Sequence, residues 1–190
     1  MSRLNAAGSS ITDLIGVCPR ARLDGAAVTT WDFPELIGTQ TYKAGEMVCL
    51  SGSAANAVGL TIPGIDASGF GIVGFAAKDA TGTGSTMSPV YVVSPEAVYV
   101  ANVGHSVTSA NAQTAALDIG QRYGLTSLSG RTYVDKQKTG VSNAMCRVIG
   151  LHGQDNIPTF YGKVYFQVFD ADCQLRSAWV ISSSPLAAAL

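Results

Sequence analysis

The feature that most constrains the fold is a series of short apolar segments that alternate between two faces and are separated by turn-forming residues. The clearest is segment 163–169, in which Val164, Phe166 and Val168 fall on one face and more polar residues on the other. Side chains of a β-strand alternate with a period of two, and β-branched and aromatic residues favour strands. The segment is therefore predicted to be a half-buried strand.

Eight further segments carry strand signals and are bounded by Gly, Ser, Thr or Asn. They cover residues 46–50, 58–62, 71–76, 90–93, 97–103, 131–134, 146–151 and 176–181. In 90–93 and 97–100 both faces are apolar, which is typical of strands that lie between two layers. The pattern predicts an all-β fold, either a β-sandwich or a β-barrel, with a division into two small β units near His105 as an open variant.

At most one or two short helices are expected beside these strands. Residues 109–119 offer one, because Ser109 can cap it, alanines and Ile119 can share one face, and Gly120 can end it. The segment 79–85 is predicted to be an exposed, mobile loop without an apolar anchor, and 151–160 is a second loop.

Residues 1–40 show no sustained period of either 2 or 3.6, and they are predicted to form an extended N-terminal arm with at most one short strand. Residues 41–190 then form the β-rich body. The arm carries Leu14, Ile15, Trp31 and Phe33, which must pack against another surface. We expect that surface to be the protein's own body, with a neighbouring subunit as the alternative.

Charge is scarce in this chain. Charged residues make up 13% of it, about half the usual share for a globular domain, and the formal net charge is −1. A neutral surface is easily desolvated, which favours a protein that covers much of its surface with partners. Without a cluster of Lys and Arg, direct nucleic-acid binding is not expected. Without an apolar run of 18 residues, a membrane span is not expected either.

The four cysteines are widely spaced and form no C-x-x-C pair, which argues against zinc ribbons and redox motifs. The first ten residues lack the apolar core of a secretory signal, so we expect cytoplasmic synthesis and reduced thiols. All four are predicted to be small buried hydrophobic residues, namely Cys18, Cys49, Cys146 and Cys173.

No catalytic residue is predicted. His105 next to Ser106 does not make a nucleophile and base, because neighbours on a strand point in opposite directions, and no G-x-S-x-G elbow is present. Cys146 with His152 is a conceivable pair without a specific signal. Both histidines are interpreted as polar residues of loops or strand ends, and the chain is not expected to be an enzyme.

No metal ligand and no cofactor-binding residue is predicted either. Asp170 and Asp172 would share a face if their strand continued, but turn and solvent roles are expected for them and for Asp118. Asp155-Asn156 is too short for a calcium loop. The glycines at 64, 69, 71 and 74 form no phosphate-binding motif and are interpreted as bulges and corners of a barrel.

Four segments resemble small structural proteins of tailed bacteriophages. They are 42–48, with its A-G-x-x-V pattern, 71–79, with G-F-A-A before a glycine-rich loop, and then 117–125 and 131–135. The resemblance is to capsid decoration, or cement, proteins, and together the segments cover about a third of the chain. These motifs bring no catalytic residue with them.

The resemblance implies a virion protein that is made in the host cytoplasm, binds the outer surface of the capsid and stabilises contacts between major capsid protein subunits. It also implies a homo-oligomer, with a trimer favoured over a dimer. An arm such as 1–40 would suit strand addition to a neighbouring sheet.

Two other functions remain open. The first is a glycan-binding or adhesion module of a virion or tail, with exposed Tyr and Trp stacking on sugars between the loops 79–85 and 151–160. The second, ranked last, is a hydrolase that uses His105, His152 and Cys146.

Overall fold

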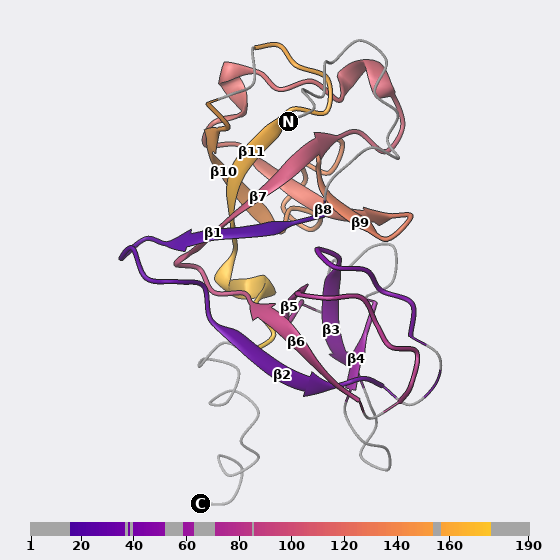
Figure 1. Cartoon of the computed structure of the whole chain (residues 1–190). Helices are drawn as coiled ribbons and strands as arrows, with labels where there is room; N and C mark the ends of the chain where they lie inside the picture. Colours follow the sequence, from indigo (N-terminus) through magenta and orange to yellow (C-terminus); the bar gives the residue numbers. More distant parts are fainter. Residues whose placement is uncertain are drawn as a thin grey trace, which may run out of the picture.

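The computed structural model describes residues 16–175 except 37, 39, 52–58, 63–70, 85 and 154–156. Within them the chain is almost entirely β, as predicted, and it forms a closed five-stranded barrel and a second sheet. The barrel occupies the upper half of Figure 1 and the second sheet the lower half. The predicted strand 176–181 and residues Leu14 and Ile15 lie outside the described residues.

Five strands close the barrel, in the order β7, β11, β10, β8 and β9. Four of the five pairings are antiparallel, and closure comes from a parallel pairing of Val103 and Gly104 with Val134 and Asp135. A closed barrel has no free sheet edge within this ring. The bounds are β7 Ala97–Gly104, β8 Arg122–Leu128, β9 Arg131–Asp135, β10 Cys146–Leu151 and β11 Lys163–Val168.

The second sheet has the order β2, β6, β5, β3 and β4, and all its strand pairings are antiparallel. A parallel bridge between Glu35 and Leu60 links its two outer strands, so this sheet also curls into a ring. The bounds are β2 Thr30–Pro34, β3 Met47–Ser51, β4 Gly59–Thr61, β5 Gly74–Ala76 and β6 Met87–Val92.

Three strands of the structure are not among the segments that the sequence predicted as strands. The first, β8, contains Gly124, and glycine is depleted in strands because it loses the most backbone entropy. Here the glycine is required: a Cβ atom would lie 2.7 Å from the carbonyl oxygen of Asn143. The others are β1 (Cys18–Arg22) and β2, which lie within the predicted arm.

The described part of the arm belongs to the protein's own body. Strand β1 pairs with β7 of the barrel, and β2 pairs with β6 of the second sheet. Val17 is buried in the main core, and Phe33 packs against the smaller core of the second sheet. The arm therefore contributes two strands rather than the single one expected.

The predicted helix over 109–119 is wrong. The segment forms two 3₁₀ turns, Ser109–Asn111 and Ala116–Asp118, joined by extended chain. Between the turns, the backbone bonds to the loop before β11: Thr114 N donates to Thr159 O at 3.0 Å, and Tyr161 N donates to Ala112 O at 2.7 Å. These long-range bonds replace the local bonds that an α-helix would need.

The main core joins the two sheets. Phe75 of β5 packs against Tyr99 of β7, with ring centroids 4.9 Å apart, and against Phe166 of β11, at 6.1 Å. Both contacts are close to edge-to-face, which suits the ring quadrupoles. A smaller core fills the second sheet, and β6 lies between the two, because Val90 contacts the smaller core and Tyr91 the main one. This agrees with the doubly apolar pattern of 90–93.

Polar contacts add to this junction. The tight turn between β8 and β9 uses positive φ angles at Ser129 and Gly130 and lies against the second sheet. Next to it, the hydroxyl of Ser127 donates to Glu46, and Met47 N donates to the hydroxyl of Thr132 at 2.9 Å. The two sheets therefore share hydrogen bonds as well as a core.

We predict that Phe75→Ala destabilises the barrel and the second sheet together. Truncating a buried Phe costs about 3–5 kcal/mol, and the lost contacts belong to both sheets. Denaturant unfolding followed by tyrosine fluorescence and by far-UV circular dichroism should show one coincident, shifted transition. Phe160→Ala, at a ring that is 37% exposed, is the control and should cost about 1 kcal/mol. Two separate transitions, of which only one moves, would contradict a shared core.

Candidate functional site

A buried ion pair lies at one end of the barrel. Lys136 Nζ is 2.7 Å from Asp118 Oδ1, and the side chains are 18% and 3% exposed. The Asp118 carboxylate also accepts bonds from Ala115 N and from the hydroxyl of Tyr123, both at 2.7 Å. Burial raises the pKa of Tyr123, and its bond to Asp118 raises it further. Asp118 is thus not the solvent-facing turn residue that was predicted.

A second buried carboxylate, Asp135, anchors the segment after β7. Its oxygens accept bonds from Ser106 N and Gln137 N, both at 3.1 Å, and from the hydroxyl of Thr126 at 2.9 Å. Three donors satisfy a buried carboxylate without a cation. This residue holds the loop to the barrel and has no open face for a substrate.

The second sheet buries an acid of its own. Glu35 is 1% exposed and accepts bonds from the backbone N–H of Thr81 at 2.8 Å and from its hydroxyl at 3.1 Å. Burial raises the pKa of the nearby Tyr42. A hydrogen bond with Ser88 lowers this pKa, and the charge of Glu35 and its hydrogen bond raise it again. The loop 79–85 is held here, since Thr81 bonds to Glu35 and Ala80 packs on the smaller core. The prediction that this loop lacks an apolar anchor is wrong.

The structure brings neither histidine to its candidate nucleophile, which was Ser106 for His105 and Cys146 for His152. His105 follows β7, and its Nδ1 accepts from Thr108 N at 3.0 Å, while the hydroxyl of Ser106 donates to Gln137. Cys146 begins β10 and His152 follows its end, which separates them by about 20 Å at the rise of a strand. Cys146 is completely buried, donates to Tyr123 O, and has a pKa raised by that burial. A thiolate at this position is strongly disfavoured.

Asp170 and Asp172 do not share a strand face. Strand β11 ends at Val168, and the two residues lie in a 3₁₀ turn, Asp170–Asp172. The turn leads the chain back to the second sheet, where Ile72 N donates to Asp172 O at 2.8 Å.

Gly71 has a φ of +66°, as expected for a corner, whereas Gly64, Gly69 and the pair Asp155-Asn156 lie outside the described residues. Over the described ranges, no group of three His, Cys, Asp or Glu side chains can hold a metal ion.

Two loops at the end of the barrel away from the second sheet form one surface, which we call the barrel cap: residues 105–121 and 157–162 (Figure 1). Backbone bonds and a bridge between Gln113 and Phe160 tie them together. A pocket of about 420 Å³ opens in the cap beside His105 and Lys136. The cap also exposes apolar side chains, including Val107 at 71% and Leu117 at 84%.

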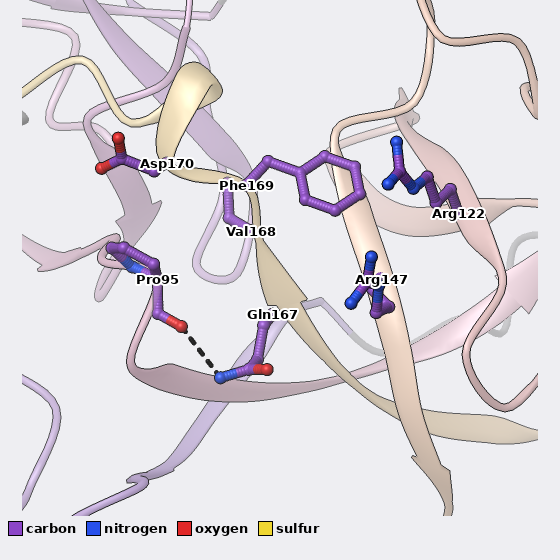
Figure 2. Close-up of a pocket in the computed structure, with 7 residues that line it drawn as sticks. All are labelled: Pro95, Arg122, Arg147, Gln167, Val168, Phe169 and Asp170. Atoms are coloured by element: carbon purple, nitrogen blue, oxygen red, sulfur yellow. Dashed lines mark hydrogen bonds between the residues drawn. The ribbon is translucent and has the colours of Figure 1, made fainter.

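A second pocket, of about 240 Å³, lies on the outer face of the barrel (Figure 2). Arg122 of β8, Arg147 of β10 and Gln167 of β11 are register partners across three strands and form its floor. Phe169 lies beside them, with the Arg122 guanidinium 5.4 Å from the ring centroid. Pro95 and Asp170 complete the opposite rim, where Gln167 Nε2 donates to Pro95 O at 2.8 Å. We call this the two-arginine pocket.

The chain was also compared with known protein families, curated proteins and solved structures. No family model, no curated protein and no solved structure matched the chain. Among the residues that the structure describes, no helix has the length and apolar character needed to cross a membrane.

We predict that removing the cation of the buried ion pair destabilises the protein more than removing an exposed one. Lys136→Met leaves Asp118 buried without its partner, which costs about 3–5 kcal/mol, whereas the exposed Lys78→Met should change little. The double variant Lys136→Met/Asp118→Leu should recover much of the loss. Urea unfolding measures all three, and equal stabilities of the two single variants would contradict the structural role.

We also predict that one thiol reacts with Ellman's reagent in the native protein. Cys18 lies exposed on β1, contrary to the prediction that all four are buried, whereas Cys49, Cys146 and Cys173 are buried. Burial also raises the pKa of Cys49 and Cys146, which lowers their thiolate fraction. At pH 8 the wild type should show one fast equivalent and three more after unfolding. Cys18→Ser should lose the fast phase, and a second fast equivalent in that variant would contradict the burial.

Proposed function

We propose that this chain is a structural virion protein that binds the outer surface of a capsid and stabilises contacts between major capsid protein subunits. The proposal continues the resemblance of its sequence to phage decoration proteins. It includes assembly as a homo-oligomer, with three copies favoured over two, and localisation on the virion surface.

The observation that carries the proposal is the barrel cap. Its two loops are tied to each other by backbone hydrogen bonds and anchored to the barrel by Asp118 and Asp135. A surface of this kind presents apolar side chains such as Leu117 in a fixed arrangement. Because these backbone bonds leave the loops little freedom to lose on binding, such a surface suits contact with another protein.

The internal chemistry supports the same interpretation. Asp118, Asp135 and Glu35 are each buried and saturated by donors within the protein. Groups held in this way stabilise the fold, and proton transfer to a substrate would break those bonds. Many identical copies on a shell would multiply a modest contact through multivalency.

We predict that the purified chain binds expanded, undecorated capsids of its own virus and raises their melting temperature. Leu117→Ser should weaken binding about 10- to 150-fold, because burying one leucine side chain contributes about 1.5–3 kcal/mol. Val141→Ser is the matched control, because Val141 is 88% exposed on the loop between β9 and β10. Co-sedimentation gives the affinity, calorimetry of the capsids gives the stabilisation, and mass photometry of the free chain gives the number of copies.

Two results would count against the proposal, the first against capsid binding itself and the second against the cap as its contact surface. One is a wild-type chain that neither sediments with expanded capsids nor changes their melting temperature. The other is equal binding of all three proteins, which would leave capsid binding standing but remove the cap as its contact surface. Circular dichroism of the variants separates either result from a loss of folding.

A further inference from the structure

The two-arginine pocket combines features that the capsid proposal does not use. Arg122 and Arg147 occupy directly opposed positions on β8 and β10, and Gln167 extends the row onto β11. Their strand neighbours Tyr123 and Cys146 point into the core, so the row lies on the outer face of the barrel. Figure 2 shows both arginine side chains on the same side of Phe169.

Neither Arg122 nor Arg147 forms an ion pair with any residue in the described part of the chain, whereas Arg22, Lys43 and Lys136 all do. Like charges at opposed positions of an antiparallel pair destabilise a sheet. An anion between them would remove this repulsion, and a carboxylate can accept two parallel N–H bonds from a guanidinium.

The rest of the lining selects among anions. Phe169 is half-buried and offers an apolar ring surface next to the arginines. Gln167 and Asp170 lie farther along the same pocket and bring an amide and a carboxylate. A carboxylate in the rim repels an acidic peptide or a phosphate chain, but it accepts bonds from hydroxyl groups. The lining therefore favours a ligand that is anionic at one end, apolar on one face and rich in hydroxyl groups elsewhere.

These features describe an acidic sugar. We propose that the two-arginine pocket binds a hexuronic or sialic acid residue of a glycan. In this arrangement Arg122 and Arg147 bind the carboxylate, the C–H face of the sugar ring packs on Phe169, and hydroxyls meet Gln167 and Asp170. A volume of about 240 Å³ suits one sugar residue rather than a long chain. The site differs from the loops 79–85 and 151–160 that the sequence suggested for a glycan.

The proposal is tested on the isolated chain without capsids, so its failure is independent of the proposed capsid function. Titrations followed by two-dimensional NMR use D-glucuronic acid, N-acetylneuraminic acid and, as a neutral control, D-glucose. At least one acid should bind at least tenfold more tightly than glucose, and binding should weaken as salt is raised. The shifted amides should lie on β8, β10 and β11.

Four variants assign the binding to the pocket. Arg122→Gln and Arg147→Gln should each weaken binding of the acid about 10- to 100-fold, because each removes a charge-assisted pair of bonds. Phe169→Leu should weaken it about threefold to tenfold. The control is Arg20→Gln, at an exposed arginine of β1, and it should bind like the wild type. Melting temperatures confirm that each variant is folded.

Three results would overturn the proposal. The acids bind no more tightly than glucose, or folded Arg122→Gln and Arg147→Gln bind the acids like the wild type. The third is that tetraglutamate, added as a competing probe, binds to the pocket more tightly than either sugar acid. That result would assign the pocket to an acidic protein segment instead.

Discussion

The packing of Phe75 against Tyr99 and Phe166 is the contact on which the rest of the structure depends. A buried aromatic ring removes about 150–250 Å² from water, which at about 25 cal/mol per Å² is worth about 4–6 kcal/mol. This is a large fraction of the stability of a whole domain, about 5–15 kcal/mol. Because the three rings come from β5, β7 and β11, the main core is shared by the barrel and the second sheet, which also has a smaller core of its own. The barrel cap and the two-arginine pocket both lie on the barrel, which this core stabilises.

Sequence patterns predicted the strands whose side chains alternate clearly or are apolar on both faces. Strand β10 was predicted with its full bounds and β11 to within one residue, and in β11 every inward position is β-branched or aromatic. Strand β8 was missed because the contacts that stabilise it join residues far apart in the sequence. Its Gly124 is needed only because the chain around Asn143 passes close to it, a contact between residues that are far apart in the sequence. The helix over 109–119 failed for the same reason, because the loop before β11 supplies its hydrogen bonds.

Long-range contacts also decide the polar sites. Nothing near Asp118 in the sequence marks it for burial, and its partner Lys136 reaches it only because β8 and β9 bring the two segments together. The two-arginine pocket was not predicted from the sequence either. Arg147 and Gln167 lay in predicted strands, but the position of Arg122 depended on the missed strand β8, and their alignment depends on register. Composition does help: in a chain with few charges, two adjacent arginines that form no ion pair with the described residues stand out once the sheet is built.

That scarcity of charge separates the roles of the two surfaces. The barrel cap exposes apolar side chains, and Lys136 beside its pocket is neutralised by Asp118, which suits the proposed contact with a protein. The outer face of the barrel instead keeps two guanidinium groups where mutual repulsion works against the sheet. In the proposed complex, the sugar carboxylate relieves this repulsion. Under the two proposals the cap provides contact area and the two-arginine pocket provides selectivity, and both lie on the barrel that the shared aromatic core stabilises.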